Sequence, residues 1–258
     1  MAAKPIRLKF NKRRIAGFTG NQLKMIALIF MLCEYIGYVL IENGVLYGQN
    51  PAYWSMALAT PEGQRWYMLA RVLRTLGRLA FPIYAFLTVE GVVHTGSIKK
   101  YVGRLIILAV ISEIPFDLAI KGVVYDPEYQ NVLFTLALGA VSAACMNRLK
   151  TWSLLIRLMI AGALCFLAYI IRSDYGAIGV AMISLMYLLR EDRNVEMISG
   201  ALLAAAESAD YACSSALAFA FIYFYNGKRG EFGMKAFFYP AYPLMLLIFW
   251  AMVYFANR

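Results

Sequence analysis

Apolar segments about as long as a membrane-crossing helix follow one another along most of this chain, and charged residues gather in the short connections between them. A helix needs about 20 apolar residues to cross the hydrocarbon core of a bilayer. The sequence therefore predicts an all-α, polytopic transmembrane helical bundle of about nine spans, with eight to ten also compatible. The spans are expected near residues 22–42, 77–95, 101–121, 131–147, 152–171, 175–190, 195–207, 211–226 and 238–256. The segments 195–207 and 211–226 are short enough to form one helical hairpin that does not cross fully.

The composition excludes a water-soluble fold. Hydrophobic residues make up 62% of the chain, and in water that share would leave a large apolar surface exposed to aggregation. The net charge of +10 is compatible with nucleic-acid binding, but the cations lie between apolar segments rather than on a soluble basic face. We therefore expect a lipid bilayer as partner and no nucleic acid. The cysteines lie inside apolar runs without metal-ligand spacing, so no metal is expected: Cys33, Cys145, Cys165 and Cys213.

The distribution of lysine and arginine predicts an orientation, because positive residues near span ends are retained on the cytoplasmic side. Residues 1–20 form a basic N-terminal segment, and residues 21–258 are expected to form a single transmembrane domain. Every second connection carries further cations: Lys99, Lys100, Arg148, Lys150, Arg190, Arg193, Lys228, Arg229 and Lys235. The N-terminus is therefore expected to be cytoplasmic.

The first outer connection, residues 43–76, is longer than the others and combines arginines with aromatic residues. It contains Arg65, Arg71 and Arg74 together with Trp54 and Trp66. This mixture is typical of a helix that lies in the membrane interface. We expect an interfacial helix here, placed where it could cover an outward-facing cavity.

Several ionisable residues lie within the predicted spans or at their ends. A charge near the bilayer centre costs at least about 2.5 kcal/mol, so such residues need a partner or a function. The candidates are Glu34, Arg78, Glu90, His94, Glu113, Asp117 and Asp174. These residues predict either a buried functional site or a set of ion pairs between helices.

Two pairs of these residues are spaced four apart and share a helix face. Glu90 and His94 could move a proton, since a nearby carboxylate raises the pKa of an imidazole and burial lowers it. A structural hydrogen bond between the two residues is the alternative. Glu113 and Asp117 need a cation, for which Arg78 is a candidate partner, and an ion-pair lock between helices is the alternative.

Polar residues also open two of the predicted spans. Asp174, followed by Tyr175, complements the amides at a helix N-terminus, and Gln130 with Asn131 opens the fourth span in the same way. Capping is the simpler interpretation. The amides of Gln130 and Asn131 could also hold a substrate carbonyl at a cavity rim.

Six segments, in order, resemble the TraX family of membrane proteins from about Gly20 to Leu247. They are LKMIALIFML, GRLAFPIYAFLTVEGVVHTGSIKKY, RLIILAVISEIPFDLA, QNVLFTLALG, DYGAIGV and YNGKRG. The resemblance implies an acetyltransferase in a bacterial-type plasma membrane, using acetyl-CoA from the cytoplasm. The family is named for a conjugal-transfer protein linked to N-terminal acetylation of F pilin. The acceptor is not implied, and a pilin-like peptide, a glycan and a lipid all stay open.

Carrying the family's polar motif positions onto this chain selects candidate site residues. They are Arg78, Glu90, His94, Glu113, Asp117, Gln130, Asn131, Asp174 and Tyr175. The chain departs from the family pattern at two positions, because Tyr35 and Met245 stand where the pattern has histidine. Enzyme status therefore stays open, with Glu34 or the Glu90 and His94 pair as substitutes for the missing histidines.

If the reaction is acetyl transfer, the site needs a base and oxyanion donors. His94 or a desolvated Glu34 could take the acceptor proton, and Arg78, Asn131 or the Tyr35 and Tyr175 hydroxyls could stabilise the oxyanion. The CoA phosphates could meet Lys99, Lys100 and Arg104 at the cytoplasmic side, although these cations also fit simple positive-inside topology. The alternatives are a proton-coupled transporter, in which Glu34, Glu90 and Glu113 form a relay, and a noncatalytic membrane assembly factor.

Overall fold

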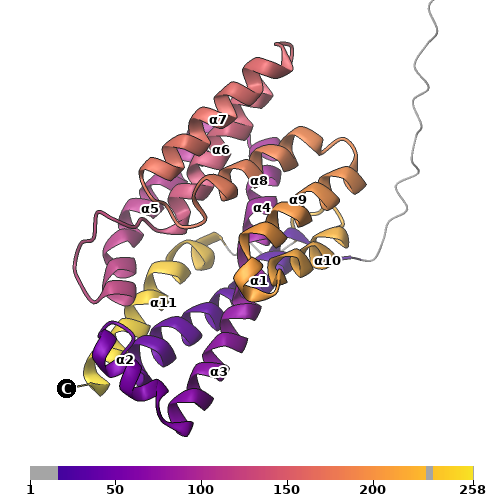
Figure 1. The fold of residues 1–258 in the computed structure, drawn as a ribbon. Coiled ribbons are helices and arrows are strands. Elements are labelled where there is room, and N and C mark those ends of the chain that lie inside the picture. The colour runs from indigo at the N-terminus through magenta and orange to yellow at the C-terminus, as the bar shows by residue number, and fades with distance from the viewer. Residues whose placement is uncertain (1–16, 231–234, 258) are drawn as a thin grey trace, which may run out of the picture.

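The computed structural model describes residues 17–230 and 235–257, so most of the predicted basic N-terminal segment lies outside the described residues. The described residues form helices and two isolated β-bridges, Phe18 to Tyr225 and Gln130 to Ser173, but no strand. The long helices are α1 (Gly20–Tyr35), α3 (Pro61–Gly77), α4 (Ala80–His94), α5 (Ile98–Lys121), α6 (Val132–Arg148), α7 (Leu154–Ile170), α8 (Gly176–Leu189), α9 (Arg193–Glu207) and α11 (Lys235–Ala256) (Figure 1). The expected all-α class is confirmed.

The first predicted span is a continuous helical stretch that changes its winding halfway. A capping box starts α1, in which the Thr19 side chain accepts from the Gln22 amide and Gln22 reaches back to Thr19. The chain then widens into the π-helix η1 (Ile36–Val45). Long π-helical stretches are rare and are often found at functional sites, and this one carries Tyr38 and Glu42.

The connection 43–76 is helical, as predicted from its composition. It contains the short helix α2 (Pro51–Leu58) and then α3, each with proline in its first turn and a capping side chain, Asn50 and Thr60, before it. Helix α3 packs against both α1 and η1. This packing places its arginines beside the polar residues of the first span.

Small residues allow close contact in the middle of the bundle. A β-carbon at Gly139 on α6 would lie 2.3 Å from Ile183 Cδ1 on α8, so glycine is required for these helices to approach. Ala140 and Ala143 are also fully buried on α6. Small residues at helix contacts are typical of membrane bundles, in which close van der Waals packing replaces hydrophobic association.

The predicted eighth span, residues 211–226, is not one helix. It is divided into the 3-10 turns η2 (Ala209–Tyr211) and η3 (Ser214–Leu217) and the short helix α10 (Ala218–Tyr223). Ala212 and Cys213 between the two turns have positive φ angles of 53° and 57°, which interrupts helical winding. The prediction of one continuous helix over 211–226 is wrong, and the segment brings Tyr211 to the side of α3. The alternative, a hairpin with 195–207 that does not cross fully, stays a prediction.

Three helical stretches among the described residues are long and apolar enough to cross a membrane, namely Gly20–Val45, Pro61–His94 and Phe237–Ala256. Shorter apolar helices cover Val132–Arg148, Leu154–Ile170, Gly176–Leu189 and Ser214–Tyr223. Helix α7 exposes an apolar face that includes Leu155, Met159 and Phe166, as expected for contact with lipid. These features support a membrane protein, whereas the count of nine spans and the cytoplasmic N-terminus stay predictions.

The connections predicted on one side of the membrane do meet in the structure. At one end of the bundle, the Phe18 amide donates a hydrogen bond to the Phe224 carbonyl, and the Gly20 amide donates one to the Lys228 carbonyl. At the other end, Asn43 bonds the carbonyl groups of Ala119 and Ile120. The alternation of the predicted connections between two ends therefore agrees with the packing at these contacts.

Candidate functional site

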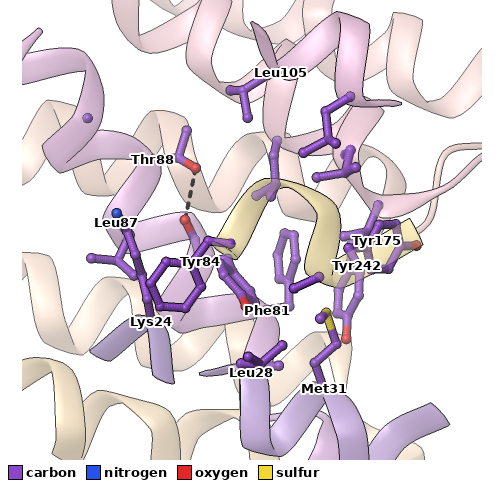
Figure 2. A pocket seen from close by; sticks show the side chains of 18 of the residues that line it. Lys24, Leu28, Met31, Phe81, Tyr84, Leu87, Thr88, Leu105, Tyr175 and Tyr242 are labelled. Carbon is purple, nitrogen blue, oxygen red and sulfur yellow. Dashed lines mark hydrogen bonds between the residues drawn. The ribbon is translucent and has the colours of Figure 1, made fainter. Parts of the chain in front are cut away.

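A cavity of about 510 Å³ lies between α1, α4, α5, α6 and α11. Its middle is lined by apolar and aromatic side chains, among them Leu28, Leu87 and Leu105. Figure 2 shows Lys24 and Tyr175 on opposite sides of Phe81, each directed toward this space. The cavity thus has polar residues at its ends and an apolar middle.

The two polar ends are far apart along the helices. Arg78 precedes α4 and His94 ends it, and a rise of 1.5 Å per residue separates them by roughly 24 Å. Glu34 lies beside Arg78, whereas Glu90 lies one turn before His94. The structure therefore places all four predicted catalytic residues on one cavity, but it divides them between two ends.

Three arginines on and just after α3 form a row at the end of the cavity opposite His94, and two of them, Arg74 and Arg78, line it. Arg71, Arg74 and Arg78 are spaced three and four residues apart, which places them on one helix face. Their guanidinium carbons lie 4.2, 5.4 and 4.5 Å from the centre of the Tyr211 ring. The Tyr211 ring therefore supports all three cations through cation–π contact.

Carboxylates from three elements meet these arginines. Arg74 Nε lies 3.2 Å from Glu34 Oε1, and its Nη1 lies 2.7 Å from Glu42 Oε2. Arg78 lies 3.7 Å from Glu34 Oε1 and 3.5 Å from Glu207 Oε1. Charges removed from water require such pairing, so the network satisfies most of its own charge.

Two atoms of this network have no hydrogen-bond partner among the described residues, namely Glu34 Oε2 and Arg78 Nε. Both residues line the cavity. An unpaired buried acceptor and an unpaired buried donor on neighbouring side chains are costly unless a water or a ligand meets them. We call Glu34, Arg74, Arg78, Glu207 and Tyr211 the arginine–glutamate cluster.

Asp174 lies beside this cluster and is held by its neighbours. Its Oδ1 accepts hydrogen bonds from the Tyr129 hydroxyl at 2.7 Å and from the Tyr175 amide at 3.0 Å. Burial raises the pKa of the Asp174 carboxyl above its ordinary value, and the Tyr129 hydroxyl and the Arg78 guanidinium oppose this shift. Asp174 precedes the capping position of α8, which Tyr175 occupies in the left-handed region at φ 62°.

Aromatic rings complete this end of the cavity. The Tyr175 ring stacks on Phe81 with ring centres 3.8 Å apart, and Arg78 lies 5.8 Å from the Tyr175 centre. The hydroxyl groups of Tyr35 and Tyr242 are 3.1 Å apart. These buried hydroxyls add hydrogen-bonding groups to the charged residues at this end of the cavity.

The opposite end is an exposed, basic rim. The His94 side chain is 67% exposed, and its Nδ1 lies 3.0 Å from the backbone oxygen of Glu90 and 3.7 Å from Glu90 Oε2. Lys24, Arg104 and Arg229 also line the cavity here. Of the predicted phosphate contacts, Arg104 therefore reaches the cavity, whereas Lys99 and Lys100 are not among its lining residues.

Four predicted substrate-binding residues lie away from this cavity. Asn131 caps α6 by accepting from the Leu133 amide, as predicted, and its side chain donates to Glu113. Asp117 accepts from the Asp126 amide at 2.8 Å. Gln130 donates to the backbone oxygens of Asp126 and Pro127.

The expected contact of Arg78 with Glu113 and Asp117 is therefore wrong. Arg78 pairs with Glu34 and Glu207 instead, because the turn between α3 and α4 directs it toward α1 and α9. On α5, Asp117 accepts from the Asp126 amide in the loop before α6, and Glu113 Oε2 accepts from Asn131, whereas Glu113 Oε1 has no partner among the described residues. Neither carboxylate forms an ion pair among the described residues, so the alternative of an ion-pair lock between helices is not confirmed.

A sequence model described as TraX protein matches residues 19–253. The chain belongs to the TraX family. It is also 28% identical over 253 residues to the probable fimbrial assembly protein FimC, serogroup H1, of Dichelobacter nodosus, covering 90% of this chain and 94% of that protein. No solved structure matched the chain.

The two departures from the TraX sequence pattern lie in adjoining parts of the structure. Tyr35 stands where the pattern has histidine in the first span, and its hydroxyl contacts Tyr242 in the last span. Met245, at the other altered position, is buried one turn further along α11. In this TraX protein the first altered position therefore contributes a hydroxyl that contacts Tyr242, and the second contributes the apolar side chain of Met245.

Several residues in or beside the arginine–glutamate cluster were missed by sequence reasoning. Arg74 and Arg71 were assigned only to an interfacial connection, although their spacing with Arg78 indicates one helix face. Neither Glu207 nor Tyr211 was among the candidate residues selected from the sequence. Each of these residues reaches the site through tertiary packing of segments far apart in the chain.

Proposed function

We propose that this TraX-family protein transfers an acetyl group from cytoplasmic acetyl-CoA to an amine or hydroxyl acceptor at or across the membrane. The observation that carries the proposal is a single cavity that joins an exposed basic rim to a buried cluster of carboxylate, guanidinium and phenol groups. Such concave sites with few convergent polar groups are the usual place of small-molecule chemistry.

The residues present fit an acetyl-CoA molecule as substrate. Lys24, Arg104 and Arg229 at the rim would meet its phosphates, because they offer cations from three separate elements. The apolar middle, which includes Leu28 and Leu105, would surround its uncharged arm. The acetyl group would then lie toward the arginine–glutamate cluster.

Within this proposal, Glu34 acts as the base and Arg78 stabilises the oxyanion. Glu34 Oε2 has no hydrogen-bond partner among the described residues and can accept the acceptor's proton, while Arg78 Nε can donate to the developing negative charge. A new bond forms from the acceptor's nitrogen or oxygen to the acetyl carbonyl carbon, the carbon–sulfur bond breaks, and the proton passes to the departing thiolate. His94 is less suitable, because it lies at the opposite end of the cavity.

The alternatives have less support. A proton relay through Glu34, Glu90 and Glu113 would need continuity, yet Glu113 is bonded to Asn131 outside the cavity. A purely structural role in assembly would leave two unpaired polar atoms buried at the cluster without a reason. The similarity to a probable fimbrial assembly protein supports an acceptor that belongs to a surface structure.

The test measures acetyl-CoA binding and acetyl transfer separately. The purified full chain in detergent is expected to bind acetyl-CoA, and Arg104→Glu is expected to weaken binding more than the control Lys99→Glu, which is not a cavity residue. Glu34→Gln should keep binding and lower the turnover roughly 100-fold or more. Turnover is followed by mass spectrometry of acetylated envelope components in cells that express either form.

Two results would contradict this function. One is the absence of acetyl-CoA binding by the folded chain. The other is an unchanged pattern of acetylated envelope components in cells with the wild-type chain, with Glu34→Gln or with no copy of it. Loss of activity in His94→Ala with full activity in Glu34→Gln would reverse the assignment of the base.

A further inference from the structure

A second chamber of about 420 Å³ adjoins the first cavity. It lies between η1, the start of α2 and the end of α5, at the end of the bundle opposite the basic rim. Tyr38 and Ile120 line both spaces, so the chambers share a wall. The polar residues that line the second chamber are Tyr38, Glu42, Asn43, Gln49 and Lys121, with Trp54 as an aromatic wall.

Arg74 connects the two chambers electrostatically. Its guanidinium lies 2.7 Å from Glu42, a wall residue of the second chamber, and 3.2 Å from Glu34 in the first. It also stacks over the Tyr38 ring at 4.5 Å. A ligand in the second chamber would therefore lie next to the arginine–glutamate cluster, with Tyr38 and Arg74 between them.

The amide side chains in the wall of the second chamber leave their oxygen atoms available as hydrogen-bond acceptors. The Asn43 amide nitrogen donates to Ala119 and Ile120 carbonyls, and the Gln49 amide nitrogen donates to Ile120. Their side-chain oxygens, and Glu42 Oε1, accept no hydrogen bond from the described residues. A ligand that donates several hydrogen bonds would satisfy these oxygens.

The charges of the chamber favour a neutral ligand. Glu42 is already paired with Arg74, and Lys121, whose side chain is half exposed, adds a cation near the opening. The Arg74 and Lys121 cations would repel a ligand that carries a free ammonium, and the Glu42 carboxylate would repel an anionic ligand. Hydroxyl groups are neutral donors, and a sugar ring can also stack on the Trp54 face.

We infer that the second chamber binds a neutral carbohydrate unit. As the acceptor of the proposed acetyl transfer, which this part of the inference assumes, the sugar would direct one hydroxyl past Tyr38 toward Glu34. Binding itself does not depend on the transfer reaction. The site therefore has a test that is independent of acetyl-CoA.

The experiment uses the detergent-solubilised full chain, fluorescently labelled, on an array of neutral mono- to trisaccharides that also carries amine-terminated peptides. Binding to a subset of the saccharides is expected without acetyl-CoA. Trp54→Leu and Gln49→Met should weaken it about tenfold, the size of one lost contact or hydrogen bond. Tyr53→Leu and Gln64→Met are the matched controls, because neither residue lines the chamber.

Each outcome decides the inference. Saccharide binding that is insensitive to salt and to Lys121→Glu, but lost in the chamber variants, supports it. Binding only to peptide amines, strengthened by Lys121→Glu, overturns it, and so does the absence of any saccharide binding by a chain that elutes and melts as folded protein. Acetyl-CoA binding measured in parallel shows separately whether the proposed function holds.

Discussion

Replacing Gly77 with alanine tests whether the arginine–glutamate cluster depends on close contact between α1 and α3. A β-carbon at this position would lie 2.5 Å from both Cβ and Oε2 of Glu34 and 2.6 Å from its Cα. The Oε2 atom can move away, but the Cα belongs to the backbone of α1, so the helices must separate. Overpacking of this kind costs about 1–3 kcal/mol, against a gain of up to about 1 kcal/mol for alanine over glycine in a helix.

We therefore expect Gly77→Ala to be destabilised by up to about 3 kcal/mol, or up to about 2 kcal/mol if the whole helical gain is realised. Gly162→Ala on α7 is the matched control, because a β-carbon there meets nothing within 4 Å, and it should be neutral or more stable. Thermal unfolding of both variants in one detergent checks this, with about 2–4 °C expected per kcal/mol. A melting temperature of Gly77→Ala equal to or above that of Gly162→Ala would refute the reasoning.

Three further variants test the charges and amides in the same unfolding assay. Arg78→Met should cost about 3–5 kcal/mol, because Glu34 loses a buried partner, and adding Glu34→Gln should recover part of this loss; additive effects would contradict the pairing. Asn131→Ala should cost about 1–3 kcal/mol by leaving Glu113 without its amide donor, so an unchanged melting temperature would exclude that role. Because burial raises the pKa of Asp174, the contribution of this carboxyl to stability is greatest at low pH and declines as pH rises through the raised pKa. The melting temperature of Asp174→Asn relative to that of the wild type should therefore increase from about pH 4 to about pH 8. A difference that stays constant with pH would contradict the raised pKa.

The helical segments were largely predictable from the sequence because their signals are local. Apolar length indicated α1, α4, α6 and α11, and capping chemistry located Asn131 at the start of α6. The segment around Ala212 and Cys213 was predicted wrongly, since its apolar composition gives no sign of two consecutive residues with positive φ. Hydropathy registers composition and is insensitive to such backbone turns.

The site was only partly predictable for a different reason. Glu34, Arg78 and Asp174, which line the cavity, were selected because a charge within or beside a span is unusual. Tyr175, which also lines it, was selected through the resemblance to the TraX family. The distance between Arg78 and His94 follows from helical rise alone, yet their assignment to one catalytic group overlooked it. The partners of Arg78 depend on how α3, α9 and the Tyr211 turn pack, which is long-range information that spacing along one helix does not contain.

The single guanidinium of Arg74 makes occupancy of the two chambers interdependent. Arg74 contacts Glu42 on one side and Glu34 on the other. A ligand that binds Glu42 in the second chamber would therefore strengthen the ion pair of Arg74 with Glu34. A ligand that binds Glu34 in the first cavity would strengthen the ion pair of Arg74 with Glu42. Thermodynamic linkage makes this influence equal in both directions. The affinity of each chamber for its ligand would therefore depend on whether the other chamber is occupied.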